Sequence, residues 1–194
     1  MFVNIFLFDG FHTMGAFGPA QIFGGAQDKF CIRYISMDGG IITSQQGVKV
    51  WTEPLNPKEI EGILLIPGGP GIKCFLHFVG ERIQDIKQAV SEADYCLMVE
   101  NGSAVLAKAG VLYHRQAADY AYDENWKRMF TVGVNYVADM KWLEDGKYYS
   151  CSDIMSALDM TLGAVSDIED LDVAEKIARQ MGYETDLSKK GLIH

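Results

Sequence analysis

Short apolar runs alternate with helical patterns along most of the chain. Continuous apolar runs of this kind are typical of strands buried on both faces of a sheet, and they occur at residues 2–8, 30–37, Ile63–Ile66 and Tyr95–Val99. Apolar residues at helical spacing follow, in a segment opened by Gly18-Pro19 and at residues 82–93, 103–109, 155–165 and 173–180. This alternation predicts an α/β fold with a mainly parallel sheet covered by helices on both faces.

Two further segments predict antiparallel hairpins at the sheet edges. β-like residues flank Gly47, at 41–43 and 48–52, and Asp145-Gly146 is a strong turn signal before residues 147–151. Neither repeats nor a linker interrupt the pattern. We therefore expect residues 1–194 to form a single domain.

The most informative stretch follows the run Tyr95–Val99. That run ends abruptly at Glu100-Asn101-Gly102, and an apolar helical pattern begins at once. A strand, a sharp turn and a helix in this order form the elbow that holds an enzyme's nucleophile in a strained backbone conformation. Serine or cysteine usually occupies the tip of such an elbow, but this chain has Glu100.

A second turn, Pro67-Gly68-Gly69-Pro70-Gly71, follows the run Ile63–Ile66. Ligands of open α/β sheets bind in the crevice at the carboxyl ends of the strands, so two such turns predict a binding site between them. The backbone N–H groups of Gly69 and Asn101 are candidates for an oxyanion hole beside Glu100. A tight turn without any ligand is the alternative interpretation of the glycine-rich loop.

Composition excludes several classes of partner. The 194 residues carry a net charge of −9, which argues against nucleic acid and anionic membrane surfaces. No apolar run approaches the roughly 20 residues of a membrane helix. The start of the chain lacks the features of a signal peptide, and the four cysteines lack Cys-x-x-Cys spacing. We expect a cytoplasmic protein with free thiols, and no cofactor or metal.

Several motifs together make the chain similar to a known family. They are Phe8-Asp9-Gly10 with Gly18-Pro19, the loop at residues 67–71, Val99-x-x-Gly102 with Leu106-Ala107-x-Ala109-Gly110, and Trp142-x-x-Asp145-Gly146-Lys147. With these motifs the chain resembles the ThiJ/PfpI superfamily over roughly residues 2–182, and most closely its isonitrile hydratase-like branch. The resemblance implies a class I glutamine-amidotransferase-like fold, which is a flavodoxin-like three-layer α/β/α sandwich, and a homodimer.

The chain departs from the family pattern where the family carries its chemistry. Glu100 stands at the position of the family's cysteine, and Gly15 aligns with the acid that hydrogen-bonds that cysteine. The histidine often found after the elbow falls near Tyr120. The family's last pocket loop reads Cys151-Ser152-Asp153. The resemblance thus implies a ligand pocket of Gly15, Gly68, Tyr120, Cys151 and Asp153, with Glu100, Asn101 and Gly69 as catalytic candidates.

Glu100 has more than one interpretation. Its carboxylate could cap the helix that follows, because acids are favoured at helix N-termini. It could also act as a general base or as a short-lived nucleophile. Cys151 could serve as a substitute nucleophile, and Glu100, Asp153 and His12 could converge on a metal ion.

Three functional hypotheses follow. The first is a catalytically altered homologue that binds a small molecule in the crevice. The second is a hydratase, or an amidase or nitrile-type hydrolase, in which Glu100 activates water. The third is a purely structural dimer module.

Overall fold

The fold centres on one large sheet. A computed structural model describes residues 1–122, 124–130, 132–185 and 187. The large sheet contains the strands β1 (Phe2–Phe6), β2 (Cys31–Ser36), β3 (Gly40–Thr43), β4 (Lys49–Pro54), β5 (Ile63–Ile66), β6 (Tyr95–Val99), β9 (Trp142–Asp145) and β10 (Tyr148–Cys151). Two short strands, β7 (Gln116–Ala118) and β8 (Asn135–Val137), pair in parallel as a separate sheet.

The eight strands lie in the order β3-β4-β2-β1-β5-β6-β10-β9. From β4 to β10 every neighbouring pair is parallel, whereas β3 and β9 are antiparallel edge strands. The central strands are almost wholly buried, which explains their continuous apolar sequences. The predicted mainly parallel α/β sheet and both hairpins are confirmed.

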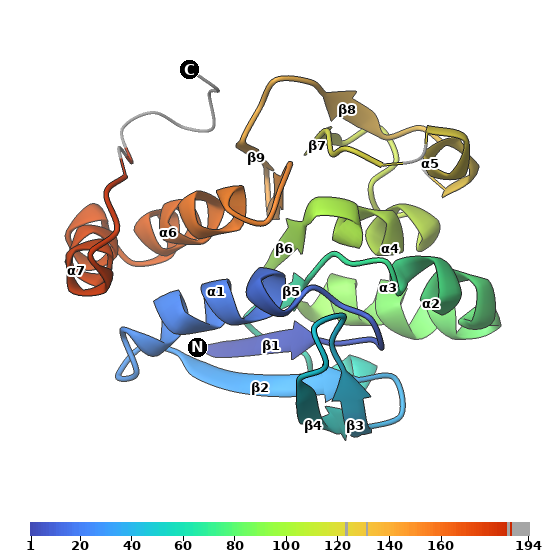
Figure 1. The fold of residues 1–194 in the computed structure, drawn as a ribbon, viewed down its shortest axis with the longest axis horizontal. Coiled ribbons are helices and arrows are strands. Elements are labelled where there is room, and N and C mark those ends of the chain that lie inside the picture. Colours follow the sequence, from blue (N-terminus) through green and yellow to red (C-terminus); the bar gives the residue numbers. More distant parts are fainter. Residues whose placement is uncertain (123, 131, 186, 188–194) are drawn as a thin grey trace.

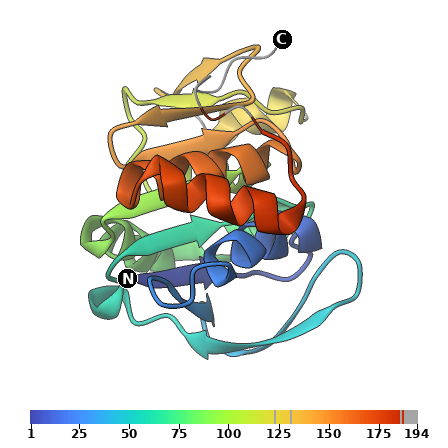
Figure 2. The same ribbon diagram turned by 90° about the vertical axis from the view of Figure 1, so that its left-hand side faces the viewer.

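The described residues also form seven α-helices, most of which pack on the sheet. They are α1 (Thr13–Gly24), α2 (Ile72–Phe78), α3 (Ile83–Glu92), α4 (Ser103–Lys108), α5 (Glu124–Phe130), α6 (Ser156–Ile168) and α7 (Leu171–Met181). Helices α1 and α6 cover one face, with α7 packed outside α6, and α2, α3 and α4 cover the other (Figures 1 and 2). None of the described helices is long and apolar enough to span a membrane.

The first helix differs from the sequence-based prediction. It begins at Thr13 rather than at Gly18, so Pro19 lies inside the helix instead of in its first turn. Proline has no N–H, so the hydrogen bond that residue 19 would donate to the Gly15 carbonyl is absent. Packing overrides this local cost, because Ile22 and Phe23 of α1 are fully buried.

The last helix begins at Leu171, slightly before the apolar pattern at residues 173–180. Asp170 is the N-cap of α7, and its Oδ1 accepts the Val173 N–H at 2.8 Å. Gly182 ends the helix in the left-handed conformation, with φ of 64°.

The order of the sheet determines which loops meet. Strands β1, β5 and β6 are neighbours and parallel, so their carboxyl ends lie at one edge of the sheet. The loop before α1, the glycine-rich loop at residues 67–71 and the turn Glu100–Gly102 leave from those ends. Segments far apart in the sequence therefore converge where α/β proteins bind their ligands.

Candidate functional site

The turn after β6 has the strained backbone predicted for an elbow. Glu100 has φ of 49°, in the left-handed region that residues other than glycine rarely occupy. The residues Glu100–Gly102 form a single 3-10 turn that leads directly into α4. Strain of this kind persists only where surrounding structure imposes it, and it is concentrated at functional sites.

The Glu100 side chain is held by a histidine from the loop before α1. His12 Nδ1 and Glu100 Oε2 are 2.8 Å apart, although the two residues are separated by 88 positions in the sequence. The side chains are 26% and 21% exposed, respectively. The N-cap residues of the turn and of α4 are Val99 and Gly102, and neither makes a side-chain capping hydrogen bond; Glu100 lies in the first turn, where a carboxylate remains favoured by the helix dipole.

Asn101 closes the elbow against the glycine-rich loop. Its Oδ1 accepts the Gly69 N–H at 2.8 Å, and its Nδ2 donates to the Gly69 carbonyl at 3.1 Å. The Gly69 N–H is therefore engaged within the protein. It can contribute to an oxyanion hole only after its hydrogen bond to Asn101 Oδ1 breaks.

Gly68 makes room for the two elbow side chains. A Cβ atom at this position would lie 2.7 Å from Asn101 Oδ1 and 2.9 Å from Glu100 Oε2. Both distances are shorter than atomic contacts allow. Glycine at position 68 thus permits the Glu100 carboxylate to face His12.

A cavity of about 250 Å³ opens beside the Glu100–His12 pair. The residues that line it are His12, Gln45, Gly69, Pro70, Glu100, Asn101, Tyr120, Ala121 and Tyr122. We call this space the elbow cavity. Its walls combine a carboxylate, an imidazole and amide groups with tyrosine side chains, so it suits a small molecule that has both polar and apolar parts.

An aromatic cluster supports Tyr120 behind this cavity. The Tyr120 and Tyr136 rings are 5.5 Å apart, and the Lys127 ammonium lies over both. Lys127 also forms an ion pair with Asp119. The Tyr120 hydroxyl is buried, and this burial raises the pKa of Tyr120 well above its ordinary value.

Some of the residues expected at the pocket lie behind it or away from it. Gly15 lies behind the site, where a Cβ atom would be 3.4 Å from Val99 Cγ1 and 3.7 Å from His12 Cβ. Cys151 and Asp153 do not line the elbow cavity.

The Cys151 thiol is unsuited to nucleophilic chemistry. Cys151 pairs with Val99 in the sheet and is completely buried, with its Sγ 3.4 Å from the Asp153 carbonyl. Burial raises the pKa of this thiol. The interpretation of Cys151 as a substitute nucleophile is therefore corrected.

Asp153 stabilises the start of α6. Its Oδ1 accepts the Ser156 N–H at 2.9 Å, and its Oδ2 accepts hydrogen bonds from the Ser156 and Ser152 hydroxyls. It does not join His12 and Glu100. In the described part of the chain, no group of three or more His, Cys, Asp or Glu residues is arranged to hold a metal ion.

The structure adds residues that the sequence did not indicate. Gln45 lies in the β3–β4 connection, where its N–H donates to the Phe11 carbonyl at 2.8 Å, and it lines the elbow cavity. No local pattern marks it. His12 was considered only as a metal ligand, and its pairing with Glu100 follows from the adjacency of β1, β5 and β6.

Comparisons with solved structures show the same fold. A ThiJ/PfpI family protein from Pseudomonas syringae superposes with a TM-score of 0.82 at 19% identity, over 95% of this chain and 76% of that one. A DJ-1 superfamily protein from Salmonella typhimurium gives 0.80 at 17% identity, over 95% and 99%. An AraC family transcriptional regulator from Pseudomonas putida gives 0.74 at 18% identity, over 93% and 98%.

Sequence comparison identifies the family. A search of curated proteins finds no match. The DJ-1/PfpI family model matches residues 1–167, which is most of the chain. The protein therefore belongs to the DJ-1/PfpI family.

Proposed function

We propose that this protein binds a small molecule in the elbow cavity and does not perform cysteine chemistry. The observation that carries the proposal is the Glu100–His12 pair at the wall of that cavity. Glu100 stands at the elbow position where the family resemblance implies a thiol, and a carboxylate is a much weaker nucleophile. Removal of a catalytic nucleophile typically lowers the rate on the order of a million-fold.

The cavity walls favour a ligand with a hydrogen-bond donor. Glu100 Oε2 is occupied by His12, and the other carboxylate oxygen has no hydrogen bond to the described residues. A ligand N–H or O–H could donate to that oxygen, while Tyr120 and Tyr122 pack against an apolar part. The role would be sensing, sequestration or regulation.

A second candidate function uses the same pair for catalysis. A carboxylate can act as a general base when it lies within hydrogen-bond reach of a water molecule, and His12 would hold the Glu100 carboxylate in place for this. If this protein hydrates isonitriles, like the branch that its sequence resembles, Glu100 would accept a proton from water while the water oxygen bonds to the terminal isonitrile carbon. That carbon and the adjacent nitrogen would gain the two hydrogens of the water, which gives an N-substituted formamide. An amidase or nitrile-type hydrolase would use Glu100 in the same way.

Titration with benzyl isocyanide and benzamide separates the two functions. The protein, its Glu100→Gln and His12→Gln variants and a His77→Gln control would be followed by thermal unfolding and by product formation. His77 is exposed on α2 and does not line the elbow cavity. A ligand at 100 times its Kd stabilises the folded state by about 2.7 kcal/mol.

If the protein only binds, the ligands should stabilise the wild type and His77→Gln saturably against thermal unfolding. They should stabilise Glu100→Gln and His12→Gln less, and no product should form. Turnover that disappears in Glu100→Gln would contradict binding alone and support the hydratase or hydrolase. If neither binding nor turnover occurs, and dimerisation survives changes in the cavity, the structural module is favoured. The homodimer itself is proposed from the family resemblance, and light scattering of the purified chain tests it.

A further inference from the structure

A second cavity lies on the other side of the glycine-rich loop. Its volume is about 320 Å³, and it lies between the ends of β1 and β2, the start of β3, and helix α2. Gly71 lines this cavity, whereas Gly69 and Pro70 line the elbow cavity. The two cavities share no lining residue, so they are separate spaces. We call the second one the aromatic cavity.

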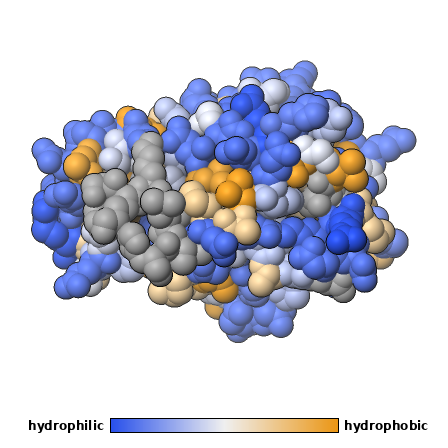
Figure 3. Space-filling model, turned by 90° about the horizontal axis from the view of Figure 1, so that it is seen from above, coloured by the Kyte–Doolittle hydropathy of each residue, from blue (hydrophilic) through white to orange (hydrophobic). Residues whose placement is uncertain are grey.

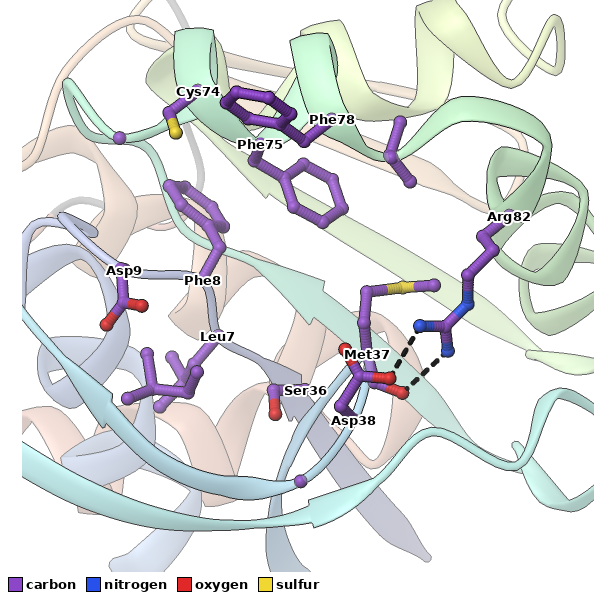
Figure 4. Close-up of a pocket in the computed structure, with 14 residues that line it drawn as sticks. Leu7, Phe8, Asp9, Ser36, Met37, Asp38, Cys74, Phe75, Phe78 and Arg82 are labelled. Carbon is purple, nitrogen blue, oxygen red and sulfur yellow. Dashed lines mark hydrogen bonds and ion pairs between the residues drawn. The ribbon is translucent and has the colours of Figure 1, made fainter.

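Aromatic and sulfur-containing side chains form one part of its walls. Figure 4 shows Phe8, Phe75 and Met37 directed toward one another across the space, with Cys74 and Phe78 beside them. The Phe8 and Phe75 rings are stacked 5.7 Å apart. Phe78 is 76% exposed at the rim, which is unusual for a phenylalanine.

The charged groups that line the aromatic cavity are hydrogen-bonded within the protein. Arg82 donates to Asp38 Oδ1 at 2.6 Å and to the Met37 carbonyl at 3.0 Å, as Figure 4 shows. Asp9 Oδ1 accepts the Thr43 N–H at 2.8 Å. That hydrogen bond comes from a neutral amide, so the exposed Asp9 carboxylate is not neutralised and the cavity disfavours an anionic ligand.

The size of the cavity sets the size of its ligand. An apolar cavity of roughly 150 Å³ accommodates benzene, and this one has about twice that volume. We propose that the aromatic cavity binds a neutral, flat molecule of one or two rings, stacked between the phenylalanine rings and Met37. Such a ligand would not compete directly with a ligand of the elbow cavity.

Cysteine alkylation provides a direct test, with indole as the neutral two-ring probe. Cys74 lines the aromatic cavity, and Cys31 is also exposed but lies elsewhere. Iodoacetamide labelling of each cysteine would be followed by mass spectrometry at increasing indole concentrations. We expect saturable slowing at Cys74 and an unchanged rate at Cys31. The anion indole-3-acetate should protect Cys74 less well.

Two variants make the test specific. Phe78→Ala removes an exposed wall of the cavity and should raise the apparent Kd for indole about fivefold to tenfold. Trp51 is a similarly exposed aromatic residue outside the cavity, so Trp51→Ala should leave the apparent Kd for indole unchanged. Thermal unfolding would verify that both variants fold.

Three results would overturn the proposal. They are no protection of Cys74 up to the solubility limit of indole, equal slowing at Cys31 and Cys74, or the same Kd in Phe78→Ala as in the wild type.

Discussion

Glu100 combines a strained backbone with a side chain that is held from a distance. Its φ of 49° is costly for any residue with a Cβ atom, and its carboxylate is fixed by His12. Gly68 and Asn101 complete this arrangement, the first by leaving space and the second by linking the elbow to Gly69. The residues that define the elbow cavity thus depend on one another.

A pair of variants tests the backbone strain separately from the side-chain contact. Glu100→Gly and Glu100→Ala both remove the hydrogen bond to His12. Only glycine also removes the strain of the left-handed backbone conformation, because it has no Cβ atom. We expect Glu100→Gly to be more stable than Glu100→Ala by about 1 kcal/mol, measured by urea unfolding. Equal stabilities, or the reverse order, would show that position 100 is not held at positive φ.

The position of Asp153 at the start of α6 makes stability depend on pH. Burial alone would raise the pKa of Asp153, but hydrogen bonds from Ser156 and Ser152 lower it below its ordinary value of 3.8. Because the folded-state pKa is lowered, this contribution to stability is present above that value and disappears as pH falls through the folded-state pKa.

Asp153→Asn should therefore destabilise the protein at pH 7, by up to about 1 kcal/mol. We expect the difference from the wild type to shrink below pH 4, in urea unfolding measured at both pH values. A difference that is independent of pH would contradict the role of the Asp153 charge.

At the scale of elements, local patterns were sufficient for the strands of the large sheet. They were insufficient for the short strand β7, for helices α2 and α5, and for the start of α1. Strands β5 and β6 were predicted at their observed bounds, because each is a continuous apolar run that ends in glycine-rich or polar turns. Helix α2 was not predicted, because it has only seven residues and no side-chain cap. The start of α1 was misplaced because His12 provides no capping hydrogen bond and Pro19 is normally a poor interior residue.

Packing between α6 and β9 predicts an unusual response to a helix substitution. A Cβ atom at Gly163 would lie 2.6 Å from Trp142 Cη2. Alanine normally stabilises a helix relative to glycine, but Gly163→Ala should destabilise this protein by about 1–3 kcal/mol, because the buried Trp142 ring must move.

Gly24→Ala at the end of α1 is the matched control. The nearest atom to a Cβ at this position would be Ile32 Cδ1 at 4.0 Å. The substitution should therefore raise the free energy of unfolding by about 0.4–1 kcal/mol in chemical unfolding. If both alanine variants stabilise the protein, the packing of α6 on Trp142 is not as described.

At the scale of the whole molecule, the sequence predicted the layers and the edge of the sheet where the site lies. It could not predict the Glu100–His12 contact, because that contact joins residues 88 positions apart and depends on the order of strands in the sheet. The face seen in Figure 3 is mostly hydrophilic, with only separate apolar areas.

The distribution of thiols across the molecule gives a simple prediction. Cys31 and Cys74 are exposed, whereas Cys96 and Cys151 are buried. Burial raises the pKa of Cys96 to about 12 and also raises the pKa of Cys151. We expect a colourimetric thiol reagent to titrate two cysteines in the native protein and the remaining two only after unfolding. Rapid native labelling of Cys151 would restore it as a candidate nucleophile.

Histidine side-chain NMR during titration with benzamide and benzyl isocyanide tests most directly whether the elbow cavity is the binding site. We predict that the His12 signals shift and saturate at one ligand per chain, while the His114 signals stay unchanged. In Glu100→Gln, saturation should need about ten times more ligand, because a hydrogen bond to a charged group is lost. Binding that leaves His12 unaffected, or no shift with either compound, would contradict the proposal.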